Sequence, residues 1–343
     1  MNKIKPRIIP VSRTARQIPE WQRALADAID RPADLFAVLG LAQADLGDDL
    51  AAHLDFPLRV PRSYVARMRL GDPRDPLLRQ VLPLGAELDI VPGFDRDPVG
   101  DLAASKAPGL LHKYQGRALL ITTGACAIHC RYCFRRHFPY GEHARSALDQ
   151  AINAIAADPG ITEVILSGGD PLSLNDDRLA DIEKRVSAIP HVRRMRIHTR
   201  LPIVLPERVD DTLLSWLNAS RLQKVMVLHA NHGNEIDTHV KAAARRLHEA
   251  GCTLLNQSVL LRGINDDASS LQTLSEALFD AGILPYYVHQ LDRVAGAAHF
   301  EVSDREALNL WHDLSARVPG YLLPRLVREH AGAHSKTPLH PVG

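Results

Sequence analysis

Three cysteines lie close together in the segment CAIHCRYC, where Cys126, Cys130 and Cys133 have the spacing Cys-x3-Cys-x2-Cys. Such a loop can place three thiolates around one corner of a metal centre. A structural zinc site usually has four protein ligands and paired Cys-x2-Cys units, and this sequence lacks that pairing. A [4Fe–4S] cluster bound by three cysteines keeps one iron open to an outside ligand. The spacing favours such a cluster, and zinc completed by His129 or His137 is the alternative.

A second motif, Ser167-Gly168-Gly169-Asp170, ends another apolar run. Glycines at the carboxyl end of a strand let the backbone approach a ligand closely, and their amides can bond polar groups of an amino acid. Alone, the segment is more often an ordinary strand-to-helix turn. In register with the cysteine loop, we interpret it as part of a cofactor site.

The elements that position these motifs repeat from about residue 118 onward, where β-rich runs alternate with amphipathic helical segments. We expect strands at 118–123, 162–167, 192–199, 224–229, 253–260 and 283–289, and helices at 146–157, 175–188, 208–217, 236–249 and 268–280. This rhythm is typical of βα units, which form a parallel sheet with right-handed crossovers. Six units are too few for a closed eight-stranded barrel, so we predict an α/β fold with a partial (β/α)6 barrel. A doubly wound sheet is the alternative, and both folds place ligands at the carboxyl ends of the strands.

We divide the chain into three parts. Residues 1–110 look helical and Pro-punctuated, as in 21–29 and 32–41, and form a helical N-terminal region. Residues 111–290 hold the partial barrel. Residues 291–343 form a short C-terminal segment with a helix near 303–317.

The overall composition points to no general surface attraction. Lys plus Arg number 41 and Asp plus Glu number 40, so we expect no nucleic-acid partner and no binding to acidic membranes. Residues 1–7 lack the apolar core of a signal peptide, and no apolar run is long enough to cross a membrane. We therefore expect a cytoplasmic protein, in whose reducing environment clustered thiols serve as metal ligands. The remaining thiol, Cys252, is expected to be a small buried apolar residue.

The cysteine spacing, followed by the glycine motif of residues 167–170, resembles the radical S-adenosylmethionine (SAM) superfamily. The resemblance implies that the open iron of the cluster binds the amino and carboxylate groups of SAM, which is cleaved to a 5′-deoxyadenosyl radical. It assigns the SAM contacts to Ser167, Gly168, Gly169 and Asp170. Gln257, in the fifth predicted strand, is expected to face the same cleft and to be a further cofactor contact. Other polar residues near strand ends are expected either to contact ligands or to bond within the barrel rim: His229, Asn231, His232 and Asn256.

The segment 111–117 resembles the part of lysine 2,3-aminomutases that binds the phosphate of pyridoxal phosphate (PLP). The resemblance gives this role to Lys113, Tyr114 and Arg117, which suits a dianion that needs several strong donors. It also assigns the amine that carries PLP to Lys336, which follows a small-residue turn and precedes Thr-Pro.

The same resemblance implies how an amino acid would be bound. Arg135 pairs with the substrate carboxylate, and Asp292 binds the distal ammonium. Glu329 occupies the position of a second carboxylate, where the family has aspartate. One cation and two carboxylates suit L-lysine, although ornithine is only one methylene shorter. A glutamate enzyme would need a cation where the carboxylates stand.

Among the aminomutases, the chain most resembles the compact bacterial form that makes (R)-β-lysine for the modification of elongation factor P. This implies a functional link to the ligase that attaches β-lysine to the factor, and an electron donor such as flavodoxin. The short tail after Lys336 leads us to expect a monomer or homodimer. The alternatives are a radical aminomutase for ornithine, arginine or glutamate, and a non-catalytic zinc-binding protein.

Overall fold

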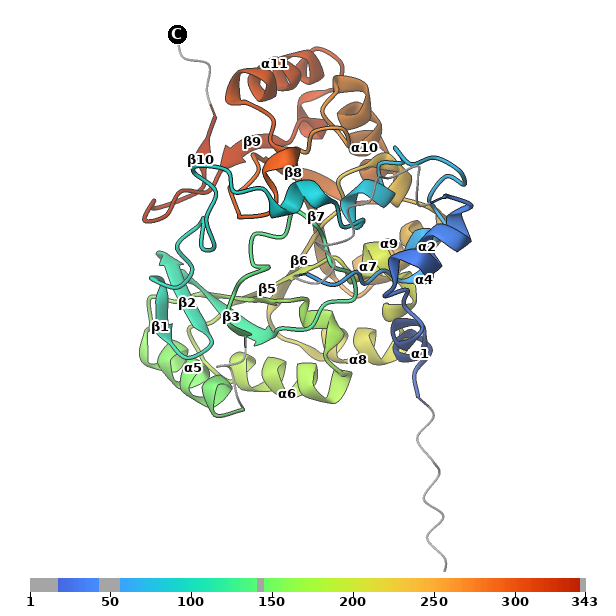
Figure 1. The fold of residues 1–343 in the computed structure, drawn as a ribbon. Coiled ribbons are helices and arrows are strands. Elements are labelled where there is room, and N and C mark those ends of the chain that lie inside the picture. The colour runs from blue at the N-terminus through green and yellow to red at the C-terminus, as the bar shows by residue number, and fades with distance from the viewer. Residues whose placement is uncertain (1–17, 43–55, 141–144, 340–343) are drawn as a thin grey trace, which may run out of the picture.

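A computed structural model describes residues 18–42, 56–140 and 145–339. Residues 1–17 and 43–55 of the predicted N-terminal region lie outside these ranges, as do residues 340–343 of the C-terminal segment. One sheet runs through the described part of the chain, with helices packed around it (Figure 1).

The sheet takes its strands in the order of the sequence. Within the described residues these are β1 (Ser105–Ala107), β2 (Leu110–Tyr114), β3 (Arg117–Thr123), β4 (Glu163–Gly168), β5 (Arg194–Thr199), β6 (Gln223–Leu228), β7 (Cys252–Val259), β8 (Leu284–His289), β9 (Arg325–Arg328) and β10 (Thr337–Pro338). From β3 to β9, each pair of neighbouring strands is parallel. The pairs β1–β2, β2–β3 and β9–β10 are antiparallel. A doubly wound sheet reverses its strand order at a switch point, so the sequential order identifies a partial barrel.

The six predicted strands are confirmed as β3 to β8, and the predicted helices lie between them. The helices of this part of the chain are α5 (Arg145–Ala157), α6 (Asp176–Ser187), α7 (Leu201–Val204), α8 (Asp211–Ala219), α9 (Thr238–Glu249), α10 (Ala268–Asp280) and α11 (Asp304–Ser315). The prediction missed the parallel strand β9 and the antiparallel strands β1, β2 and β10. The segment expected as a phosphate-binding stretch before the first strand is a hairpin, in which Gly116 makes the turn with φ 80°.

The N-terminal region contributes three α-helices to the described residues: α1 (Glu20–Ala26), α2 (Pro32–Leu39) and α4 (Arg62–Val65). They lie on one side of the barrel (Figure 1), where α4 contacts α7. Ser63 Oγ donates to the carbonyl of Val204 at 2.8 Å, and Arg67 Nη2 donates to that of Ile203 at 2.7 Å. The sheet runs from β1 to β10 across the predicted boundaries at 110 and 290, which stay predictions.

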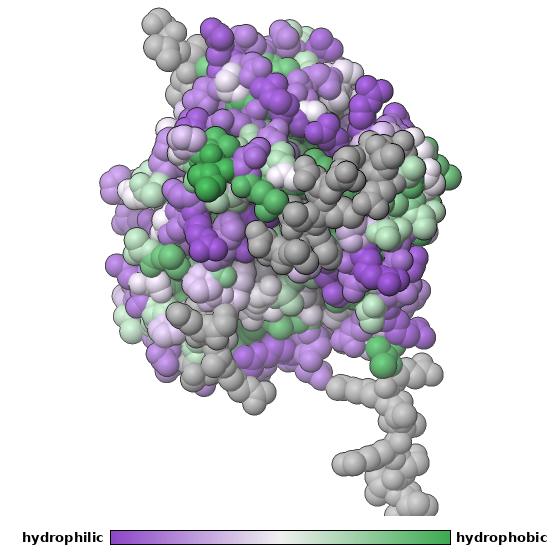
Figure 2. Space-filling view, in the orientation of Figure 1, coloured by the Kyte–Doolittle hydropathy of each residue, from purple (hydrophilic) through white to green (hydrophobic). Residues whose placement is uncertain are grey.

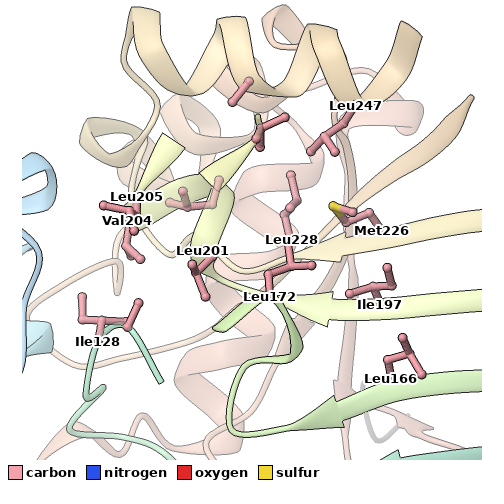
Figure 3. Close-up of a cluster of buried hydrophobic side chains, with 14 of the residues drawn as sticks. Ile128, Leu166, Leu172, Ile197, Leu201, Val204, Leu205, Met226, Leu228 and Leu247 are labelled. Carbon is pink, nitrogen blue, oxygen red and sulfur yellow. The ribbon is translucent and has the colours of Figure 1, made fainter. Parts of the chain in front are cut away.

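The hydrophobic core lies between the sheet and its surrounding helices. Leu166, Ile197 and Met226 come from three neighbouring strands and point into the same buried cluster (Figure 3). Ile128 of the cysteine loop lies in that cluster too, so burial of an apolar side chain helps to fix the loop. Because side chains alternate along a strand, Ser167 is on the opposite face of β4 from Leu166, toward the barrel interior.

The two ends of the sheet face each other across the opening of the barrel. Within the described residues no strand pairing closes it. Instead, Lys113 of β2 forms an ion pair with Glu329, the residue after β9, with Nζ and Oε1 3.0 Å apart. The predicted phosphate-binding residues and the predicted PLP lysine therefore lie on opposite sides of one opening.

The surface mixes polar and apolar side chains. In the view of Figure 2, small apolar areas are interspersed among polar ones. Of the helices in the described residues, none has the length and apolar character needed to span a membrane.

Glycine is required at positions 168 and 169 because the backbone of residues 123–125 passes very close to them. Gly168 has φ 124°, and a Cβ built there would lie 2.4 Å from the carbonyl oxygen of Thr123. A Cβ on Gly169 would lie 2.4 Å from the carbonyl oxygen of Ala125. The glycines therefore let β4 dock directly against the start of the cysteine loop.

We predict that Gly168→Ala lowers the free energy of unfolding by about 2–4 kcal/mol, because the methyl group meets backbone at a positive φ. Urea unfolding measures the change. Gly320→Ala is the control, since its φ is not positive and a Cβ there meets no atom within 4 Å. Equal, small effects of the two substitutions would contradict the argument.

Candidate functional site

The cysteine loop begins directly after β3, at the carboxyl end of the sheet. Its backbone bonds to the N-terminal region, with the amide of His129 donating to the carbonyl of Arg59 at 3.0 Å and that of Arg131 to Gln80 at 2.9 Å. The buried Arg131 side chain also pairs with buried Glu87, with Nη2 and Oε2 2.5 Å apart. The loop is thus held from the side opposite the barrel.

The three clustered cysteines are free, half-buried thiols. Burial raises the pKa of Cys126 well above its usual value, and the neighbouring Cys133 adds to the rise. Burial also raises the pKa of Cys133 to about 11, with Cys130 contributing. Thiolates crowded into such a place need a cation, and metal coordination deprotonates thiols outright. The donor set therefore fits an iron–sulfur cluster.

The two histidines considered as zinc ligands contact backbone carbonyls. His129 Nδ1 lies 2.8 Å from the carbonyl oxygen of Pro57, and its ring stacks on Phe56. His137 Nε2 lies 3.1 Å from the carbonyl oxygen of Ala295. Among the described residues, no group of three or more His, Cys, Asp or Glu side chains is placed around one metal ion. The three cysteines of a [4Fe–4S] cluster bind different irons, so this finding bears on a zinc site and not on a cluster.

The glycine motif joins the cysteine loop through backbone bonds. The amide of Gly169 donates to the carbonyl of Thr123 at 2.7 Å, and that of Asp170 donates to Ala125 at 2.8 Å. The glycine amides were expected to be available to a ligand, and that of Gly169 bonds the chain itself. The carbonyl of Gly168 accepts from the Tyr140 hydroxyl at 2.9 Å. Assignment of the motif to SAM stays a prediction.

A line of ion pairs connects the cysteine loop with the C-terminal lysine. Arg135, 8% exposed, donates from Nε to Asp101 Oδ2 at 2.7 Å. Asp101 Oδ1 lies 2.6 Å from Lys113 Nζ, which lies 3.0 Å from Glu329 Oε1. Glu329 Oε2 then accepts from Lys336 Nζ at 2.8 Å. Four predicted site residues are thereby brought together, and Asp101 is one that the sequence did not reveal.

Other predicted residues adjoin this line. Ser167 Oγ accepts from Arg135 Nη1 at 2.9 Å. Arg117 lies over the ring of Tyr114, 4.6 Å from its centroid. Gln257 is half-buried on β7, and alternation along that strand places it on the barrel's inner face.

The polar residues after β6 mostly bond within the protein. Asn256 accepts from the amide of Ala230 at 2.9 Å and donates to its carbonyl at 3.0 Å. His232 Nδ1 accepts from the amide of Asn234. Burial lowers the pKa of His229 to about 3, so its ring is neutral, and its Nε2 lies 2.9 Å from the Tyr132 hydroxyl.

The carboxylates of the site are electrostatically unequal. Burial would raise the pKa of Glu329, but Lys336 and Lys113 hold it below its usual value. Burial raises the pKa of Asp292 to about 7, and the charge of Glu329 adds to the rise. Asp292 Oδ1 is buried without a hydrogen-bond donor among the described residues. Lys336 and Lys113 lower the pKa of Asp292 only in part, and among the described residues they form ion pairs with Glu329 and not with Asp292.

Two charged residues near the cysteine loop were also missed. Arg200 follows β5 and donates to Cys130 Sγ at 2.7 Å and to Glu235 Oε2 at 2.9 Å. The position of Arg200 at a strand end was a signal that could have found it. Glu235, by contrast, lies beyond the strand in a short 3₁₀ helix.

Comparison with known proteins identifies the class to which this fold and loop belong. Residues 120–272 match the model of the radical SAM superfamily. The L-lysine 2,3-aminomutase of Escherichia coli (strain K12) is 50% identical over 323 residues, which cover 93% of this chain and 94% of that protein. That of Haemophilus influenzae is 46% identical over 333 residues, covering 96% and 98%. That of Clostridium subterminale is 35% identical, covering 94% of this chain and 78% of its own.

The chain belongs to the lysine 2,3-aminomutase family of radical SAM proteins. Membership implies a [4Fe–4S] cluster, SAM and PLP as cofactors. The three clustered cysteines fit the cluster, because crowded, half-buried thiolates need a cation. The opening of the barrel fits PLP, because it brings the amine of Lys336 beside Glu329 and Lys113, and Lys113 lies on the hairpin that also carries Tyr114 and Arg117.

We predict that Asp292→Asn stabilises the cofactor-free protein relative to wild type as pH rises from 5 to 8. A carboxyl whose pKa is raised on folding is protonated in the folded state, so its contribution is lost between the unfolded pKa near 4 and the folded pKa of about 7. The difference in unfolding free energy should grow by about 2–3 kcal/mol across that window.

Chemical denaturation at several pH values measures this difference. Asp313→Asn removes an exposed carboxylate and serves as the control. A difference between Asp292→Asn and wild type that does not change with pH would refute the elevated pKa.

Proposed function

We propose that the protein is an L-lysine 2,3-aminomutase, which moves the 2-amino group of L-lysine to carbon 3 and yields β-lysine. The line of ion pairs from Arg135 to Lys336 carries the proposal, because it joins the cysteine loop to an amine in one site. The close relatives named for this activity support it. When bound, the cluster and SAM supply a radical that removes hydrogen, and PLP holds the migrating amino group.

Three separate groups of residues would bind the cluster, SAM and PLP. Cys126, Cys130 and Cys133 hold the cluster, and the segment 167–170 with Gln257 forms the SAM side of the site. Lys336 provides the amine for PLP, whose phosphate lies beside Lys113, Tyr114 and Arg117. Because these residues come from both sides of the barrel opening, a bound cofactor would bridge the two ends of the sheet.

The proposed substrate residues select an amino acid by the distance between its carboxylate and its distal ammonium. The guanidinium of Arg135 binds the carboxylate, and Asp292 with Glu329 binds the distal ammonium. The raised pKa and unpartnered oxygen of Asp292 support this role, since an ammonium would supply the missing cation. Glu329, by contrast, already forms ion pairs with Lys113 and Lys336.

We further propose that the β-lysine serves a ligase that modifies elongation factor P, with a flavodoxin-like electron donor. Coverage of 94% of the compact Escherichia coli relative supports this form of the enzyme. A monomer or homodimer in the cytoplasm completes the proposal. Four free thiols in the described residues suit a reducing compartment.

Anaerobic incubation of the reconstituted protein with L-lysine, SAM and dithionite should produce β-lysine, measured by chromatography and mass spectrometry. Arg135→Gln should reduce kcat/KM at least about 100-fold, since the carboxylate loses a charged bidentate partner. Asp313→Asn, at an exposed position, is the matched control. Turnover of ornithine or glutamate in place of lysine would overturn the substrate assignment.

Borohydride reduction in the presence of PLP should label Lys336, located by peptide mass spectrometry. Lys336→Arg should abolish the label while leaving the absorption of the iron–sulfur cluster unchanged, because the two sites use different residues. Lys106→Arg replaces an exposed lysine and should keep the label. A label that persists in Lys336→Arg would move the PLP amine elsewhere.

A further inference from the structure

A buried guanidinium contacts one of the proposed cluster ligands. Arg200, 6% exposed, donates from Nη1 to Cys130 Sγ at 2.7 Å and to the Tyr132 hydroxyl at 2.7 Å. The other two clustered cysteines have no such charged donor among their hydrogen bonds within the described residues. The contact therefore distinguishes Cys130 from its neighbours.

The other side of the guanidinium is held by buried acceptors. Its Nη2 donates to Glu235 Oε2 at 2.9 Å, to Gln80 Oε1 at 2.6 Å and to the Tyr64 hydroxyl at 3.1 Å. Glu235 is fully buried and also accepts from the amide of Asn231 at 2.8 Å. Burial would raise the pKa of Glu235. Arg200, the amide of Asn231 and the side-chain amide of Gln80 lower this pKa, so the carboxylate is charged.

The backbone of Arg200 is fixed as firmly as its side chain. Its amide donates to Asp170 Oδ2 at 2.7 Å, and Asp170 Oδ1 accepts from the Thr199 hydroxyl at 2.7 Å. The amide of Asp170 in turn bonds the carbonyl of Ala125, one residue before the first cluster cysteine. Arg200 and the cysteine loop are thus positioned by the same residue.

The reduction potential of an iron–sulfur cluster depends on nearby charge and on hydrogen bonds to its sulfurs. Reduction adds an electron, so a cation donating to a ligand sulfur stabilises the reduced cluster. We propose that Arg200 is a positioning residue that raises the reduction potential of the cluster through Cys130, with Glu235 as its counter-charge. This inference rests on the proposed cluster at the three cysteines and deepens the proposed function.

Two single substitutions should shift the potential in opposite directions. Arg200→Gln removes the donor and leaves the charge of Glu235 unbalanced, so the midpoint potential should fall. Glu235→Gln leaves the guanidinium on Cys130 without its counter-charge, so the potential should rise. A loss of packing alone has no reason to reverse sign between the two variants.

The measurement is a reductive titration of the reconstituted protein without SAM, followed by the electron paramagnetic resonance signal of the reduced cluster. The double variant Arg200→Gln with Glu235→Gln should lie below wild type but above Arg200→Gln, because it restores neutrality without the donor. Arg200→Lys keeps the charge and provides a second variant if Arg200→Gln does not fold.

A matched control is available in Arg208, which is also fully buried. Its Nη2 pairs with Asp176 at 2.8 Å, and its Nε donates to the carbonyl of Leu172. Arg208→Gln removes a buried guanidinium that contacts no cluster cysteine, so it should leave the potential unchanged.

The outcomes separate this inference from the proposed function. A wild-type protein that assembles no cluster, shown by iron and sulfide analysis, would refute the function and the inference together. A cluster that assembles in all variants with one common potential would refute the role of Arg200 alone. Shifts of the same sign in Arg200→Gln and Glu235→Gln would also refute it.

Discussion

Asp170 joins the ends of three neighbouring parallel strands. It follows β4, and its amide bonds the loop after β3. Its carboxylate oxygens accept from Thr199 at the end of β5 and from the amides of Arg200 and Leu201 after it. Burial raises the pKa of this carboxyl, while these donors act to lower it. A buried carboxylate without them would be costly, so the three strand ends must keep their positions for the group to stay paired.

The site is built from buried charges whose pairing is nearly complete. Buried ion pairs gain little stability once desolvation is counted, so their value here is geometric. Along the line from Arg135 to Lys336, each cation adjoins a carboxylate, and removing one member would leave a buried charge unpaired. Asp292 is the exception, with an oxygen that has no donor among the described residues and a pKa raised to about 7. Its environment therefore favours the arrival of a cation.

The sequence predicted the elements whose signals are local. Six strands followed from β-rich runs, and the cysteine and glycine motifs were found because their residues are neighbours. Strands β9 and β10 escaped because four and two residues carry too little pattern. They form through pairing with other strands: β9 pairs with the distant β8, where Tyr287 lies opposite Arg325, and β10 pairs with β9 across the turn that holds Lys336.

The missed site residues escaped for a related reason. Asp101 lies in a segment without helical or strand periodicity, and its partner Arg135 is 34 residues away. Arg200 contacts Gln80 across 120 residues of sequence, so only the fold brings the two together. The sequence predicted that Gly168 and Gly169 let backbone approach a ligand, whereas in the structure they lie against the start of the cysteine loop. In each case the missing information was tertiary contact.

The cysteine loop is short, yet it contacts three separate segments of the chain through charged groups. Arg131 fixes it to Glu87 of the N-terminal region, Cys130 meets Arg200, and Arg135 begins the line to Lys336. Radical transfer requires the reacting atoms to be held within a narrow range of distance and orientation. A loop that is held by three buried charged groups is suited to this requirement. The same contacts link the charges around the three cysteines to Arg135, the proposed partner of the substrate carboxylate.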